Sequence, residues 1–77
     1  MKLELFEIED RPVAVDVSGS SGRAWAWSAG SWREAPGLVL KSALEGEALD
    51  PVSFSKRFPD ADLAAISSKG ELVSASG

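Results

Sequence analysis

The 77-residue sequence contains no cysteine and no histidine. The lack of cysteine excludes disulfide bonds and leaves no thiol from which to infer the redox compartment. Without either residue, the chain has no Ser-His or Cys-His pair for nucleophilic catalysis. A zinc site would have to consist of carboxylates alone, which is unusual for that metal. We therefore expect a non-catalytic protein with no metal and no cofactor.

Positive charge and long apolar runs are also scarce. Eight lysines and arginines stand against twelve acidic residues, and the resulting net charge of −4 argues against non-specific binding of nucleic acid. No apolar run approaches the length of a membrane span, and the N-terminus has no apolar signal segment. We expect a cytoplasmic protein that binds neither nucleic acid nor membrane.

The length predicts one small domain over residues 1–77. A single core of this size contributes only about 3–5 kcal/mol of stability. Since disulfides are excluded, a partner, a second copy or efficient packing must supply any reinforcement.

All three tryptophans of the chain lie between Arg23 and Glu34. Strict alternation predicts a strand with Trp25 and Trp27 on one face. A tight turn follows, in which Gly30 takes the positive φ of a short hairpin. Trp32 then begins the return strand. Because a buried tryptophan brings about 150–250 Å² of contact, this ribbon is expected to dominate the core.

The other segments are assigned from their apolar spacing and their turn residues. At the N-terminus, Leu3 and Leu5 point to one face of a strand while Phe6 and Ile8 point to the other, so either both faces are covered or the strand has a bulge. In the next strand three valines alternate, and we expect them to share a face with the tryptophans. The expected elements are strands at 2–9 and 13–17, helices at 38–45 and 51–58, and a C-terminal hairpin formed by 63–67 and 71–75.

These elements predict a small single α+β domain. Its antiparallel sheet consists of an N-terminal meander plus the C-terminal hairpin, with the two short helices packed on one face. The expected core is Val13, Val15, Val17, Trp25, Trp27, Leu40, Leu44, Phe54, Phe58 and Ile66.

One loop carries a possible ligand site. A strand, an acid and a Gly/Ser loop follow one another in residues 15–23, and this stretch resembles the first phosphate loop of the actin-like and sugar-kinase ATPases. The resemblance implies that backbone N–H groups and hydroxyls hold phosphate while the acid organises a metal. The favoured alternative is a plain hairpin loop, for which the same residues are suited. The residues concerned are Asp16, Ser18, Gly19, Ser20, Ser21, Gly22 and Arg23.

A second set of residues is suited to contact with another protein. Trp32 and Arg33 lie beside a turn, and tryptophan and arginine are enriched at binding hot spots. The acids Glu45, Glu47 and Asp50 are interpreted as a solvated face that could meet a basic surface, with cation ligation as the other possibility.

The expected function is a small acidic protein-binding domain of the regulatory, inhibitor or immunity type. It would act through a sheet edge or an acidic face on another protein or on a second copy of itself. The alternatives are a small-ligand or nucleotide-phosphate-binding domain that uses loop 18–23, or an accessory subunit of a larger assembly.

Overall fold

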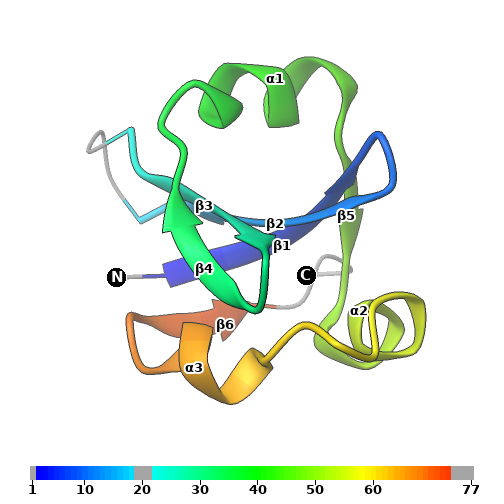
Figure 1. Cartoon of the computed structure of the whole chain (residues 1–77). Coiled ribbons are helices and arrows are strands. Elements are labelled where there is room, and N and C mark those ends of the chain that lie inside the picture. The colour runs from blue at the N-terminus through cyan, green and yellow to red at the C-terminus, as the bar shows by residue number, and fades with distance from the viewer. Residues whose placement is uncertain (1, 19–21, 74–77) are drawn as a thin grey trace.

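One six-stranded sheet organises the chain, and β1 is its central strand (Figure 1). The computed structural model describes residues 2–18 and 22–73. The strand order is β4-β3-β2-β1-β5, and β6 pairs in parallel with the first half of β1. All the other pairings are antiparallel, which confirms the small α+β domain. The elements are β1 (Lys2–Ile8), β2 (Arg11–Asp16), β3 (Ala24–Ser28), β4 (Ser31–Glu34), α1 (Leu38–Glu45), β5 (Glu47–Leu49), α2 (Pro51–Arg57), α3 (Leu63–Ser67) and β6 (Glu71–Val73).

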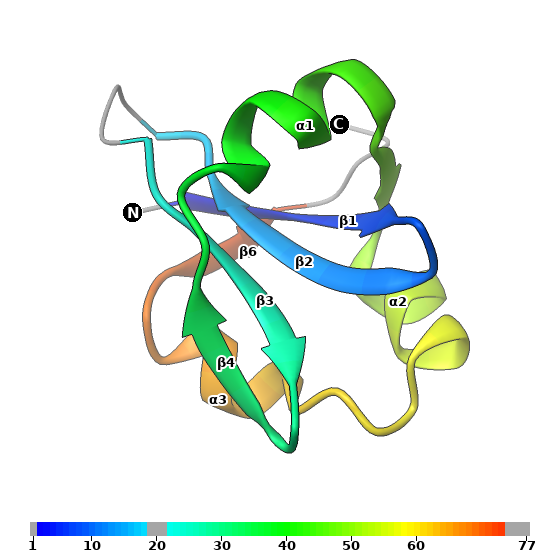
Figure 2. The ribbon, with the colours of Figure 1, turned by 45° about the horizontal axis from the view of Figure 1, so that its top comes forward.

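Two-residue turns close the β1–β2 and β3–β4 hairpins of the N-terminal meander (Figure 2). The second turn has positive φ at Ala29 (53°) and Gly30 (78°), as predicted for Gly30. The first turn has positive φ at Glu9 (50°) and Asp10 (63°), where no glycine is present. Two consecutive positive φ angles are typical of the type I′ turn, whose twist matches that of the flanking strands.

β1 is covered on both of its faces. Leu3 and Leu5 are fully buried in one apolar cluster, while Ile8 is buried in the other with Phe6 beside it. The pairing with β2 runs without interruption along the strand, so the structure has no bulge here. Of the two alternatives left open by the sequence, the covered strand is the correct one.

The prediction that Trp25 shares a face of the sheet with the valines was wrong. The register places Trp25 opposite Ala14, whereas Val13 and Val15 lie opposite alanines of β3. Trp25 and the valines therefore point to opposite faces of the sheet. Alternation gives the period of a strand, but where both faces are buried it does not say which stripe goes to which face.

The helices cover both faces of the sheet, whereas the sequence predicted one. In Figure 1, α1 lies above the sheet, and α2 and α3 lie below it. We call these faces the α1 side and the α2/α3 side. The α1 side packs Leu38 and Val39 of α1 on Phe6, Ile8, Val13, Val15, Ala24 and Ala26. The α2/α3 side packs Phe54 and Ile66 with Leu3, Leu5, Ala14 and Trp25.

Residues 63–67 form α3, so the predicted C-terminal hairpin is wrong. The carboxylate of Asp62 accepts a hydrogen bond from the backbone N–H of Ala65 (3.1 Å) and caps the helix. One turn then brings Ile66 into the core. The second predicted strand does form, but as β6 paired with β1; residues 74 and 75 lie outside the described residues.

The two predicted helices are confirmed at 38–45 and 51–57. Five of the predicted core residues are buried, namely Val13, Val15, Trp25, Phe54 and Ile66, and Trp27 and Phe58 are half-buried. The prediction was wrong for Val17, Leu40 and Leu44, which are exposed. The two leucines are exposed because α1 turns Leu38, Val39 and Ser42 toward the sheet.

Candidate functional site

Charge is divided unequally between the two sides of the sheet. Strand alternation and the ion pairs assign most of the charged residues to a side, and the others lie on or beside a helix of that side. The α1 side has four cations (Lys2, Arg11, Arg33, Lys41) and four acids (Glu4, Glu9, Glu45, Glu71). The α2/α3 side has four cations (Arg23, Lys56, Arg57, Lys69) and eight acids (Glu7, Asp10, Asp16, Glu34, Glu47, Asp50, Asp60, Asp62). The whole net charge of −4 therefore lies on the α2/α3 side.

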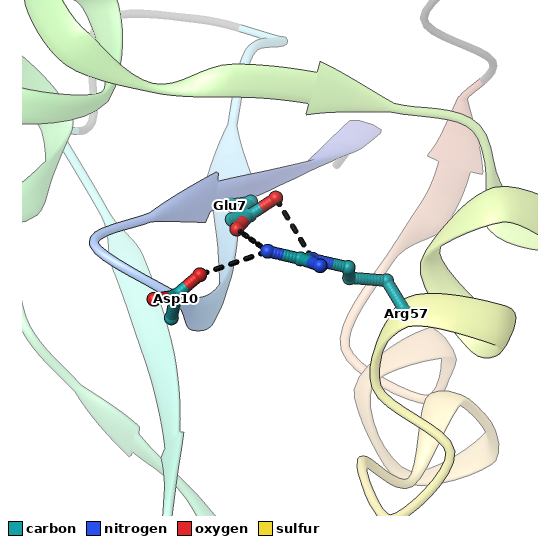
Figure 3. Close-up of polar contacts among 3 residues, drawn as sticks. All are labelled: Glu7, Asp10 and Arg57. Atoms are coloured by element: carbon teal, nitrogen blue, oxygen red, sulfur yellow. Dashed lines mark hydrogen bonds and ion pairs between the residues drawn. The ribbon is translucent and has the colours of Figure 1, made fainter.

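Arg57 links the end of α2 to the β1–β2 hairpin (Figure 3). Its Nε and one Nη donate to the two carboxylate oxygens of Glu7 at 3.1 and 2.5 Å, and the same Nη donates to Asp10 at 2.8 Å. Hydrogen bonding to this guanidinium lowers the pKa of Glu7. The same bonds raise the pKa of Arg57. Glu7 is only 14% exposed, so its charge depends on this partner.

Glu47 lies directly opposite Glu7 in the β1–β5 pairing. Like charges facing each other across a sheet are unfavourable. Arg57 forms its ion pairs with Glu7 and Asp10. Its positive charge therefore acts on the negative charge of Glu47 only by electrostatic attraction, without a hydrogen bond. Within the described residues, the carboxylate of Glu47 forms no ion pair, so it remains available to an external cation.

Arg57 lines two hollows. The larger is open and has a volume of about 630 Å³, and the smaller has a volume of about 290 Å³. The larger is lined by Glu7, Glu47, Leu49, Ser53, Lys56 and Arg57. The smaller is lined by Pro12, Trp27, Arg57, Phe58, Pro59, Asp60 and Ala61. We call the two hollows together the acidic groove, because their lining holds three acids and two cations.

The apolar wall of the groove is part of a row of aromatic rings in contact with one another. Trp27 meets Trp32 edge to face at 5.4 Å, and Trp32 stacks on Phe54 at 6.3 Å. Phe58 lies against Phe54 at 5.3 Å. Because Phe54 is fully buried, the half-exposed Trp27 and Phe58 are held in place from behind.

The five predicted partner-contact residues do not form one patch. Glu47 lines the acidic groove, but Glu45 ends α1 on the opposite side of the sheet. Trp32 packs inward and donates its Nε1–H to the backbone carbonyl of Asp62 at 2.8 Å, while Arg33 is exposed on the α1 side. Asp50 caps α2 by accepting a hydrogen bond from the backbone N–H of Ser53 at 2.7 Å, and this bond lowers its pKa.

Sequence reasoning missed Trp27, Arg57 and Phe58 as groove residues. Trp27 and Phe58 had been assigned to the core. They are half-exposed because they lie at its edge. The pairing of Arg57 with the distant Glu7 and Asp10 had no signal in the sequence.

The proposed phosphate loop is held by contacts of its own. One carboxylate oxygen of Asp16 accepts hydrogen bonds from the backbone N–H and the hydroxyl of Ser18, at 2.9 and 2.6 Å. Arg23 pairs with Glu34 at 2.6 Å and lies 5.0 Å from the centre of the Trp25 ring. Gly22 has a positive φ of 66°, as a turn requires, and Gly19, Ser20 and Ser21 lie outside the described residues. These contacts favour the plain hairpin loop.

Across residues 2–18 and 22–73, no three acidic side chains converge in a way that would hold a metal ion. In the same part of the chain, no helix has the length and apolar character needed to cross a membrane. No family model, curated protein or solved structure matches this chain. The function proposed below is therefore inferred from the geometry of the molecule.

Proposed function

We propose that the protein is a non-catalytic protein-binding domain of the regulatory, inhibitor or immunity type, and that the acidic groove receives a basic segment of its partner. The observation that carries this proposal is the concentration of the entire net charge on the α2/α3 side. An acidic surface attracts a basic one and speeds their encounter.

The groove supplies the two ingredients of a protein contact. Trp27 and Phe58 offer apolar rings that are rigid because the core supports them, and such anchors contribute most to binding. Glu47 and Asp60 add carboxylates without an ion pair among the described residues. An apolar residue of the partner would contact the rings while a neighbouring lysine or arginine meets Glu47 or Asp60.

The edge of the sheet is a weaker candidate for the same role. β4 forms one edge but has only four residues, two of which are the charged Arg33 and Glu34. Short, charged edge strands are a common means of preventing strand addition. The acidic groove therefore remains the proposed surface.

The test is a comparison of two charge reversals that have the same composition. Glu47→Lys changes the groove, whereas Glu45→Lys makes the same change on the α1 side. Each variant and the original protein would capture partners from the native host at low and high salt, with quantification by mass spectrometry. We expect a basic partner that high salt releases and that Glu47→Lys, but not Glu45→Lys, weakens.

A partner that both variants lose equally, or that binds equally well at high salt, would contradict the proposal. Trp27→Phe and Trp27→Ala extend the test, because the first keeps an aromatic ring on the groove wall and the second removes it. Only the second should weaken the same partner.

A further inference from the structure

α1 exposes two of its three leucines. Leu40 and Leu44 are 68% and 75% exposed and lie one turn apart on one stripe, whereas Leu38 and Val39 pack on the sheet. The middle of its inward face is Ser42, which is only 2% exposed. A helix on a core normally buries its leucines and exposes its serines.

The contacts of α1 explain how this orientation is fixed. The backbone N–H of Gly46 donates to the carbonyl of Ser42 at 3.0 Å. A Cβ at position 46 would lie 2.7 Å from that carbonyl oxygen and 3.0 Å from the ring of Phe6. The lack of a side chain at 46 thus allows the end of the helix to lie close to Phe6 of β1.

The charges of the α1 side are balanced, in contrast to the acidic groove. Lys41 pairs with Glu9 at 3.1 Å, and Arg33 and Glu45 have no ion pair among the described residues. A second copy that met this face about a two-fold axis would bring charges of both signs together. In an antiparallel pair of α1 helices, Glu45 of one copy lies toward Lys41 of the other.

We propose that the outward face of α1 is a self-association surface, through which two copies of this chain pack Leu40 and Leu44 against each other. This inference is independent of the proposed function, because it uses the other side of the sheet and leaves the acidic groove open. Two groove-bearing copies could then bind a partner together.

The size of the surface predicts a weak dimer. Stable dimers bury about 800 Å² per partner, and α1 has only eight residues. We therefore expect a dissociation constant between about 10 µM and 1 mM, with monomers at lower concentration. Removal of both leucines should weaken the dimer at least about tenfold, because they provide most of the apolar contact.

Sedimentation equilibrium from about 5 µM to 2 mM tests the proposal, over a range that brackets the expected constant. The original protein should change from monomer to dimer across it. Leu40→Gln/Leu44→Gln should raise the dissociation constant at least about tenfold, while the matched control Val52→Gln should dimerise like the original, since Val52 is 66% exposed on α2. Glu45→Lys should weaken the dimer by placing a lysine against Lys41, whereas Glu47→Lys on the other side should not.

Three results would overturn the proposal. The original protein could remain monomeric over the whole range. The dimer could persist unweakened in Leu40→Gln/Leu44→Gln, which would place the interface elsewhere. Glu47→Lys could weaken the dimer as much as Glu45→Lys, which would assign self-association to the acidic groove. Because partner capture by the groove is measured separately at low concentration, each of these results leaves the proposed function to its own test.

Discussion

The two sides of the sheet are packed with residues of different size. The α2/α3 side uses large residues, and Trp25, Phe54 and Ile66 are almost completely buried there. The α1 side uses Ile8 with valines and alanines, under a helix that turns Leu40 and Leu44 outward. The first side also carries the whole net charge of the protein, whereas the second is electrically balanced.

This difference separates stability from interaction. On the α2/α3 side, buried aromatic rings support a groove whose acidic rim faces solvent. On the α1 side, Leu40 and Leu44 are mostly outside the core, so they are free to contact another molecule. Substitutions chosen as pairs, one on each side, can measure this division.

The largest expected effect is that of Phe54→Ala on the α2/α3 side. Truncation of a fully buried phenylalanine costs about 3–5 kcal/mol, which equals the stability expected of so small a core. The variant should be largely unfolded. Leu44→Ala on α1 should change the free energy of unfolding by less than about 0.5 kcal/mol. Urea unfolding followed by circular dichroism measures both, and equal losses would remove the distinction between the sides.

Gly46→Ala should be the most damaging small change on the α1 side. The added Cβ would lie 2.7 Å from the Ser42 carbonyl oxygen, and overpacking of this kind costs about 1–3 kcal/mol. Gly37→Ala is the matched control, because nothing lies within 4 Å of a Cβ there. If the two alanines had the same effect on the urea midpoint, the close contacts of Gly46 with the Ser42 carbonyl and the Phe6 ring would be refuted.

Ser42→Ala should stabilise the protein by about 1–2 kcal/mol, because its buried hydroxyl has no hydrogen-bond partner among the described residues and alanine is the better helix former. Ser55→Ala on the exposed part of α2 isolates the contribution of helix propensity, about 0.5 kcal/mol. A gain no larger than that of Ser55→Ala would show that the Ser42 hydroxyl is satisfied.

The smallest expected effect is a change in acid sensitivity. Folding lowers the pKa of Glu7, so this group adds stability above its unfolded pKa of about 4.3 and loses it as pH falls through the lower folded value. Arg57→Gln should reduce the loss of stability on acidification, since it removes the largest cause of the lowered Glu7 pKa. Lys56→Gln removes the same charge but none of the bonds to Glu7 and Asp10, so it should leave the loss of stability on acidification unchanged. Urea midpoints measured across the acid range provide the comparison.

Local patterns predicted most elements but not their placement. Apolar spacing and turn residues identified α2, the alternation around Trp25 identified β3, and the signal at Gly30 located a turn. The register of β3 and the side on which each helix packs depend on long-range contacts that alternation does not encode.

The site was predicted less well than the fold. Glu47 was found from composition, while the separation of Glu45 from Glu47 follows from the helix-to-strand change at Gly46. α3 was mistaken for a strand because five residues show too little of a helical period.

The account depends most on the outward orientation of Leu40 and Leu44. The protein contains leucines in both environments, since Leu3 and Leu5 are fully buried. Methyl NMR with a soluble paramagnetic agent, at a concentration well below the expected dimer constant, compares them in one sample. We predict strong broadening of the Leu40 and Leu44 methyl signals and protection of those of Leu3 and Leu5. Equal protection of all four would contradict the account.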